Sequence, residues 1–259
     1  MSRQNIKLND FKLFVQTFKA LSKQLDSVKI NFNSEGFTIY GKNSVSRIET
    51  FSNSALAEKD PVEFCILDFQ MFLKVLQTVQ EIHKEDESEI KMWFDFPFIK
   101  IESDKFKTKL STCKEEVIVN SISQKIKTQL VPVFEFLTSS KQIKSVNSHS
   151  FIMSDVESSR IYLLTDSEME NNAIYAKIGN ETNELNNSMT LKLGIVTSGN
   201  IDGRKLIINF DRLNSLNIVD SEEIKVQLMD KNVLMNAINI RGCGDCYTIF
   251  KIYVSLLAN

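Results

Sequence analysis

A repeated structural plan constrains this chain more than any single motif does. An amphipathic helix, a hairpin of alternating residues, a strand leading into a second helix and two or three further strands are expected within residues 1–114, and again within residues 132–259. Repetition at this scale fixes the architecture before any chemistry is considered. We therefore predict an α+β chain of two similar domains, each with two helices packed on antiparallel sheets, joined by a connector at residues 115–131.

The first copy begins with a helix predicted over residues 8–25. Its apolar face consists of Leu8, Phe11, Phe14, Val15, Phe18, Leu21 and Leu25. The opposite face carries no acid and consists of Asn9, Lys12, Gln16, Lys19 and Lys23. Period-two alternation predicts a hairpin over residues 28–40, followed by strands at 44–53 and 62–67. Asp68 is placed to cap a second helix whose polar face includes Gln70, Lys74 and Gln77. Strands are expected at 90–94, 98–103 and 105–113.

The second copy follows the same order. A strand at 133–137 leads to a helix capped by Ser139 or Ser140, with Lys141, Lys144 and Ser148 on its outer face. Strands are expected at 151–154, 160–165, 173–178, 189–196, 206–210, 223–228, 233–240 and 247–256. Asp211 takes the place that Asp68 holds in the first copy, and caps a short helix with Arg212, Asn214 and Ser215 directed outward.

Composition excludes several classes of protein. No apolar run approaches the length of a membrane helix, and no signal-peptide core follows the first residues. Four scattered cysteines do not form a disulfide framework, so we expect a reducing compartment and a cytoplasmic protein. The net charge of −2 is unusual for a DNA-binding domain.

The distribution of charge is more informative than its sum. Acids gather in loops and turns, as at Glu35, Glu58 and residues 85–89, whereas the polar faces of the helices are mostly basic or neutral. If the helices lined one surface together, the protein would be acidic outside and basic within. For any single helix, a face bearing lysines is most often an ordinary solvated face.

These patterns resemble the DNA polymerase sliding clamps of the two-domain kind, namely proliferating cell nuclear antigen and the clamps of T-even phages. The resemblance covers nearly the whole chain. It rests on residues 33–39 in the first copy, on residues 206–210 followed by Asp211 in the second, and on the closing hairpin from Ile240 to Phe250. The short helix after Asp211 looks more like the phage clamps, which suggests a viral source and, in that case, the host cytoplasm.

The resemblance implies a ring of three identical chains with the helices lining a central hole. The DNA-facing side chains would be Lys12, Gln16, Lys19, Lys23, Lys74, Gln77, Lys141, Lys144 and Arg212. Such side chains make sequence-independent phosphate contacts with double-stranded DNA. By position, the subunit interface would pair residues 105–113 with 189–196 of a neighbour, through Phe106, Thr108, Leu110, Met189, Leu191 and Leu193.

The resemblance also implies a pocket for apolar peptide anchors of the DNA polymerase and other factors. By position, its candidates are Val45, Ile48, Val117, Ile118, Val119 and Tyr253. The three consecutive residues 117–119 are an apolar cluster in an otherwise polar connector. Equally, these residues could simply hold the connector against the sheet.

No pattern of residues in the sequence indicates a catalytic site. His83 lies near a charged turn and His149 on a weak helix, and neither pattern points to a general base or a metal ligand. The chain has no GxxxxGK[ST] phosphate loop, so loading of the ring would need a separate ATP-dependent clamp loader. Cys243 and Cys246 have the spacing of a redox or zinc motif, but they sit in a Gly-rich turn without a second pair. We read them as a hairpin turn, with a reversible disulfide as the alternative.

The sequence therefore predicts a processivity factor without enzymatic activity, cofactor or metal. It would encircle duplex DNA as a homotrimeric ring and tether the replicative polymerase. The alternative is a monomeric or heteromeric polymerase processivity subunit of the same fold. A protein that depends on the cysteine pair for redox or metal chemistry is a third alternative. Which polymerase it serves and whether the free ring is open or closed stay undecided at this level.

Overall fold

The computed structural model describes residues 3–83, 89–119, 130–153, 160–165, 172–179, 188–201 and 206–257. The chain divides into two compact units. The first comprises Met1–Lys125 and Asn239–Phe250, and the second comprises Ile126–Ile238 and Lys251–Asn259. This division differs from the sequence-based boundaries because residues 239–250 pack with the first unit.

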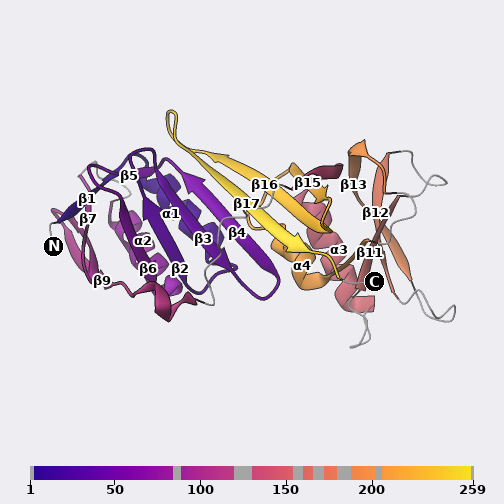
Figure 1. Cartoon of the computed structure of the whole chain (residues 1–259), viewed down its shortest axis with the longest axis horizontal. Coiled ribbons are helices and arrows are strands. Elements are labelled where there is room, and N and C mark those ends of the chain that lie inside the picture. Colours follow the sequence, from indigo (N-terminus) through magenta and orange to yellow (C-terminus); the bar gives the residue numbers. More distant parts are fainter. Residues whose placement is uncertain are drawn as a thin grey trace. The chain divides into compact units, whose positions relative to one another are not determined.

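The first unit contains the predicted helices and strands in the predicted order, with β1 and β5 in addition (Figure 1). Its elements are β1 (Gln4–Leu8), α1 (Phe11–Leu21), β2 (Val28–Phe32), β3 (Phe37–Lys42), β4 (Ser46–Ser52), β5 (Ala55–Ala57), β6 (Val62–Ile66), α2 (Phe69–Ile82), β7 (Lys91–Asp95), β8 (Phe98–Ser103), β9 (Phe106–Ser111) and the 3-10 turn η1 (Glu115–Val117). One sheet has the order β5-β1-β7-β8-β9, and a second contains the run β4-β3-β2-β6.

Phenylalanine builds the core of the first unit. Strands β2 and β3 alternate buried and half-buried residues, which directs Phe32 and Phe37 inward. Their rings meet Phe14 and Phe18 of α1, and Phe18 also lies 5.2 Å from Phe72 of α2, between ring centroids. Both helices are thereby fixed on the same sheet face, with their polar sides turned away from it.

Side-chain caps define where these helices begin. The Asp10 carboxylate accepts a hydrogen bond from the Leu13 backbone N–H at 2.8 Å, and Asp68 accepts one from Met71 at the same distance. Each cap satisfies a backbone donor that has no partner within the helix. Helix α1 therefore starts at Phe11, and Leu8 belongs to β1 rather than to the helix predicted for it.

The second unit repeats this order. Its elements are β10 (Pro132–Thr138), α3 (Ser140–Met153), β11 (Arg160–Thr165), β12 (Ala173–Ile178), β13 (Met189–Gly199), β14 (Leu206–Asn209), α4 (Phe210–Ser215), β15 (Ile224–Met229), β16 (Val233–Arg241) and β17 (Tyr247–Ser255). Its strands follow the order β14-β11-β12-β13-β10-β15-β16. Strands β16 and β17 contribute residues to both units. Within the described residues, β1, β5 and the 3-10 turn η1 are the elements that the sequence did not predict.

The closing hairpin is anchored within the first unit. Tyr247 and Asn53 exchange hydrogen bonds, since Tyr247 N–H donates to the Asn53 side chain and Asn53 N–H donates to the Tyr247 carbonyl. Beneath them, the buried hydroxyls of Thr17, Thr248 and Ser52 are linked at 2.8 Å each. Burying a hydroxyl group without a hydrogen-bond partner is unfavourable. This chain of hydrogen bonds therefore favours one position of the hairpin on the first unit.

The α+β class with antiparallel sheets is confirmed, because every strand pairing named between described residues is antiparallel. Two local predictions are wrong. Residues 151–153 continue α3 instead of forming a strand. The cap of α4 is Asn209, which accepts from the Arg212 N–H at 3.0 Å, whereas Asp211 lies within the helix.

The described residues contain neither a candidate membrane helix nor a candidate metal site. No helix among them is both long and apolar enough to cross a membrane. In the same residues, no group of three or more His, Cys, Asp or Glu side chains is arranged to hold a metal ion.

Candidate nucleic-acid interface

The helices of the first unit present the predicted basic surface. Lys12, Gln16, Lys19 and Lys23 are exposed along α1 and the turn that follows it. On α2, Lys74 is exposed and Gln77 is half-buried. The two helices pack together, and Gln70 of α2 donates a hydrogen bond to the Ser22 carbonyl at the end of α1 at 2.7 Å. The first unit therefore brings these six side chains to one helical layer.

This layer has few acids. Glu81 is exposed at the end of α2, and Asp26 follows α1. No ion pair joins any carboxylate to Lys12, Lys19, Lys23 or Lys74 among the described residues. Unpaired ammonium groups on long stems are suited to exchangeable contacts with phosphates.

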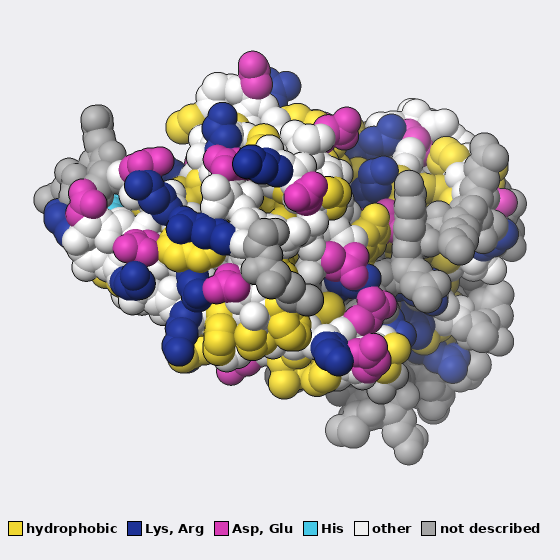
Figure 2. Space-filling view, turned by 60° about the vertical axis from the view of Figure 1, so that its left-hand side comes forward, with side chains coloured by type: hydrophobic (Ala, Val, Ile, Leu, Met, Phe, Trp, Pro, Cys, Tyr) yellow, Lys and Arg dark blue, Asp and Glu magenta, His cyan; other side chains and the backbone are white. Residues whose placement is uncertain are grey.

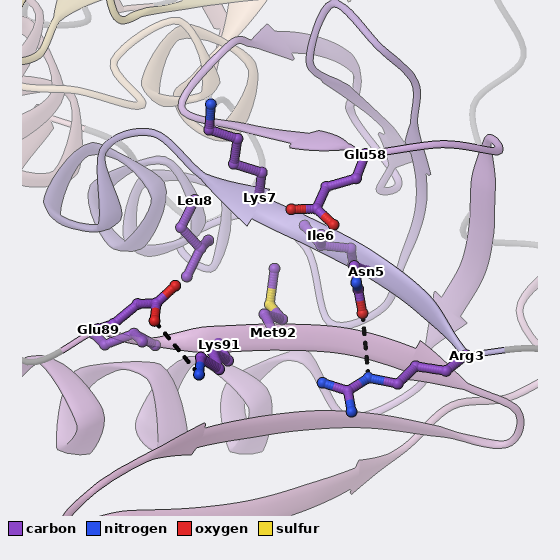
Figure 3. A pocket seen from close by; sticks show the side chains of 10 residues that line it. Arg3, Asn5, Ile6, Lys7, Leu8, Glu58, Glu89, Lys91 and Met92 are labelled. Atoms are coloured by element: carbon purple, nitrogen blue, oxygen red, sulfur yellow. Dashed lines mark hydrogen bonds and ion pairs between the residues drawn. The ribbon is translucent and has the colours of Figure 1, made fainter.

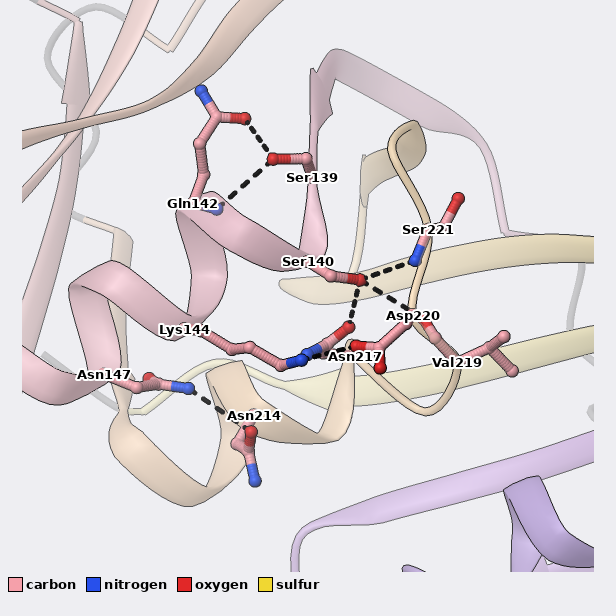
Figure 4. A network of polar contacts seen from close by, with 10 residues as sticks. All are labelled: Ser139, Ser140, Gln142, Lys144, Asn147, Asn214, Asn217, Val219, Asp220 and Ser221. Carbon is pink, nitrogen blue, oxygen red and sulfur yellow. Dashed lines mark hydrogen bonds and ion pairs between the residues drawn. The ribbon is translucent and has the colours of Figure 1, made fainter.

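The second unit presents fewer available cations. Lys141 is exposed on α3, but the Lys144 ammonium lies 2.5 Å from the Asp220 carboxylate (Figure 4). That pair belongs to a polar network in which the Ser140 hydroxyl donates to Asn217 at 2.6 Å and accepts from the Ser221 N–H at 2.7 Å. The network fixes the start of α3 against the loop that precedes β15, so Lys144 has a structural partner that the sequence did not reveal.

Arg212 departs further from its prediction. It is half-buried on α4, and its Nε and Nη1 atoms are buried without a hydrogen-bond partner among the described residues. Ser215, which was expected to point outward, is 3% exposed and donates to the Asp211 carbonyl. The exposed residues of this six-residue helix are Asp211 and Asn214, so of the three side chains predicted to point outward only Asn214 is exposed.

The surface away from the helices is not uniformly acidic. Exposed Lys107 and Lys109 lie on β9, and Lys100 of β8 pairs with Asp95 at 2.5 Å. On the part of the first unit turned forward in Figure 2, basic and acidic side chains are interspersed. The expectation of an acidic exterior is therefore wrong for this sheet.

A hollow of about 480 Å³ lies beside β1 and β7, and no sequence pattern indicated it (Figure 3). The Arg3 guanidinium sits 3.9 Å from the centre of the Trp93 ring, and its Nε donates to Asn5 at 3.2 Å. Lys91 pairs with Glu89 at 3.4 Å at one side of the same hollow. Because both cations and carboxylates line the hollow, it favours neither an anionic nor a cationic ligand.

Two strand edges correspond to the predicted subunit interface. Strand β9 is the last strand of its sheet, and among the described strands it pairs with β8 alone. Residues 189–194 of β13 pair with β12, and β10 joins β13 only from Ile195 onward. Phe106, Thr108, Leu110, Met189 and Leu191 are half-buried, whereas Leu193 is 0% exposed and belongs to the core of its own unit.

The residues predicted to form the peptide pocket differ in how far their side chains are exposed. Val117 and Val119 are 57% and 59% exposed, but Ile118 is 3% and Ile48 0% exposed. The two isoleucines therefore reach no surface that a peptide could contact in this structure. Val45 is half-buried in the first unit, and Tyr253 is half-buried in the second. Residues 120–129 of the connector and residues 84–88 of the acidic stretch lie outside the described part.

The remaining candidate residues have structural partners. His83 Nε2 lies 2.8 Å from the Ser103 hydroxyl, and His149 Nδ1 lies 2.7 Å from the Ser145 carbonyl. Cys243 and Cys246 lie in the turn between β16 and β17, where Cys246 N–H donates to the Cys243 carbonyl at 3.1 Å. The hairpin-turn reading of this motif is confirmed, and both thiols are free.

Comparison with known proteins gives one consistent result. No protein-family model and no curated protein sequence matches the chain. Among solved structures, the PCNA of A. fulgidus, determined with the C-terminal region of FEN-1, matches with a TM-score of 0.69 and 9% identity over 100% of this chain and 99% of that one. The PCNA of Entamoeba histolytica gives 0.67 and 12% over 100% of both chains. The PCNA of Thermococcus kodakaraensis gives 0.65 and 14% over 99% of this chain and 100% of that one.

At such low identity the likeness lies in the fold and not in the residues, and it extends over the whole of each chain. The chain therefore has the fold of the PCNA sliding clamps.

Proposed function

We propose that the protein is a DNA sliding clamp, a processivity factor that encircles duplex DNA and tethers a DNA polymerase without catalysing a reaction itself. The full-length match to PCNA structures carries this proposal, since it includes both copies of the duplicated plan. The basic helical layer of the first unit supports it independently, because a clamp must hold phosphates without reading bases.

The DNA-facing surface consists mainly of the exposed lysines on α1, α2 and α3. Lys12, Lys19, Lys23 and Lys74 have no carboxylate partner among the described residues, and Lys141 is likewise unpaired there. Gln16 and Gln77 add neutral hydrogen-bonding groups between them. Lys144 and Arg212 contribute less, because the first is paired and the second is half-buried.

Ring closure would pair β9 of one chain with residues 189–194 of β13 in the next. Each segment has an edge that pairs with no described strand. Residues alternate between half-buried and exposed along β9 and along residues 189–192, because successive side chains point to opposite faces of the sheet. Exposed strand edges invite pairing with another chain, and a closed ring of three would use both edges in every chain.

Client proteins would dock through the exposed apolar side chains of Val117 and Val119. Exposed valines beside a polar segment are a modest signal for a docking surface. The A. fulgidus clamp was determined with a terminal peptide region of a partner, which makes peptide docking a reasonable expectation for this chain too. An ATP-dependent loader would open the ring.

The first test measures DNA synthesis on primed circular DNA with the polymerase and loader of the same source. The wild-type protein should lengthen the products. Changing Lys12, Lys19 and Lys141 together to Glu should shorten them and lower the salt concentration at which stimulation is lost, because three phosphate contacts become repulsive.

The matched control changes Lys59, Lys231 and Lys251 to Glu, which alters the net charge equally on exposed residues outside the helices. This variant should stimulate synthesis like the wild type. If both variants lost stimulation equally, the effect would come from the overall charge of the protein. That result would contradict the proposal that the helical lysines contact DNA.

The alternative function is a processivity subunit of the same fold that binds the polymerase without forming a closed homotrimer. The paired Lys144 and the half-buried Arg212 leave the second unit with less available charge, and this favours the alternative to a limited extent. The oligomeric state in solution separates the two.

A further inference from the structure

Two cysteines far apart in the sequence face each other in the first unit. Cys65 lies in β6, and Cys113 follows β9 just before η1. They form an isolated antiparallel bridge in which the Cys113 N–H donates to the Cys65 carbonyl at 2.9 Å. Residues opposed in a hydrogen-bonded antiparallel pair have Cα atoms about 5.5 Å apart. That separation falls inside the range that a disulfide spans.

Both cysteines line a cavity of about 350 Å³. Its lining also includes three aromatic residues and three carboxylates, namely Phe64, Phe94, Phe96, Glu63, Glu115 and Glu116. Cys65 is 2% exposed, whereas Cys113 is half-buried. A small reagent in the cavity therefore meets the Cys113 sulfur first, and Cys65 stands behind it as a resolving thiol.

The surroundings keep both thiols protonated at neutral pH. Burial raises the pKa of the Cys65 thiol to about 12, and the neighbouring Cys113 is the second cause. Burial also raises the pKa of Cys113. Because the thiolate is the reactive form, exchange at this site should be slow near neutrality and faster in alkaline solution.

We propose that Cys65 and Cys113 form a redox modification site at which a small disulfide, such as oxidised glutathione, is reduced and an intrachain disulfide is made. The Cys113 thiolate attacks one glutathione sulfur, forms a mixed disulfide and releases one glutathione thiolate. The Cys65 thiolate then attacks the Cys113 sulfur and releases the second glutathione. Two protein thiols are oxidised, one small disulfide is reduced to two thiols, and the two protein protons pass to the glutathione thiolates or to solvent.

The link would fasten the start of the connector to the edge of β6. That segment is already held by the Lys29 ammonium, which lies 2.6 Å from both Glu63 and Glu115, and by the burial of Ile118. A covalent bond at Cys113 would restrain residues 114–119 further, including the exposed Val117 and Val119. The inference does not depend on ring formation or on DNA binding.

The test uses the full chain with Cys243 and Cys246 changed to Ser, so that the turn thiols do not compete. The protein is incubated with oxidised glutathione, alkylated, digested without reduction and analysed by mass spectrometry. We expect a linked peptide pair containing residues 65 and 113, the loss of two hydrogen atoms, and full reversal by dithiothreitol. The rate should rise about tenfold for each pH unit between about 7 and 8.

Two further variants are made in the protein with Cys243 and Cys246 changed to Ser. They test whether Cys113 reacts with glutathione before Cys65 does. Cys65→Ser should accumulate a stable glutathione adduct on Cys113, because no thiol remains to resolve it. Cys113→Ser should not react, because Cys65 is buried. Hydrogen exchange of residues 114–119 should slow in the oxidised protein.

Three results would overturn the proposal. They are a glutathione adduct on Cys113 that persists while Cys65 is present, a Cys113→Ser protein that reacts as fast as its parent, and thiols that stay fully reduced at alkaline pH in the folded protein. The first and third results are read with both Cys65 and Cys113 in place, so they do not depend on whether a variant at either position folds.

Discussion

Gly242 shows how one residue positions the closing hairpin. A Cβ atom at this position would lie 2.3 Å from the Asp10 carboxylate and 2.8 Å from the Leu13 side chain. The same carboxylate accepts a hydrogen bond from the Cys243 N–H at 2.8 Å while it caps α1. The close approach of Gly242 therefore lets one carboxylate hold both the helix start and the turn.

We expect Gly242→Ala to destabilise the protein by about 1–3 kcal/mol, because the added methyl group must displace Asp10 or Leu13. Urea unfolding followed by circular dichroism measures the change. Gly244→Ala is the control. Its φ of +59° brings backbone strain, but nothing lies within 4 Å of the added Cβ, so about 1 kcal/mol is expected. A larger loss for Gly244→Ala than for Gly242→Ala would contradict this account of the turn.

The exposed face of α1 could be foreseen because helical periodicity alone separates the faces of this helix. Lys12, Gln16 and Lys19 are exposed as the pattern predicts. The fate of Arg212 could not be foreseen, since it depends on how α4 packs and not on local periodicity. Similarly, nothing in residues 117–119 indicates that Ile118 alone turns inward.

At the scale of elements, the start of the short helix α4 could not be predicted from the sequence. Asn209 and Asp211 are both good N-cap residues, and only two positions separate them. The choice depends on where β14 ends, and that is set by the pairing of Asn209 with Arg160 of β11. Strand β1 was missed for a related reason. Within its five residues only Ile6 is fully buried, and its partners β5 and β7 are distant in the sequence.

Asn209→Ala should cost about 1 kcal/mol of stability, because the Arg212 N–H loses its acceptor. Asp211→Ala should cost only a few tenths of a kcal/mol, since it loses just the interaction of its charge with the helix dipole. Chemical denaturation of both variants tests the assignment. If Asp211→Ala proved the more damaging change, the cap would have to be reassigned to Asp211.

At the scale of the whole molecule, the duplicated plan could be predicted from the sequence because it rests on many weak signals that agree. The chain repeats strand, helix, strands, helix and strands in both units. The match to the PCNA structures covers the full length of this chain. Assembly could not be predicted in the same way, since it depends on two strand edges whose partners would lie in another chain.

Light scattering measures that assembly directly. The closed-ring account predicts a particle of about 89 kDa, three times the chain mass of 29.7 kDa. A mass equal to that of one chain throughout the micromolar range would favour the monomeric processivity subunit. In a monomer, the strand edges of β9 and β13 would remain available for pairing with other proteins.

Topological retention on DNA tests the central claim most directly. Protein loaded by its ATP-dependent loader onto nicked circular DNA is washed at high salt, which suppresses ordinary phosphate contacts. Half of the sample is then cut once with a restriction enzyme. We expect the protein to stay on the intact circle and to leave the linear molecule through its ends. Equal retention on both forms, or loss from both, would contradict the encircling clamp.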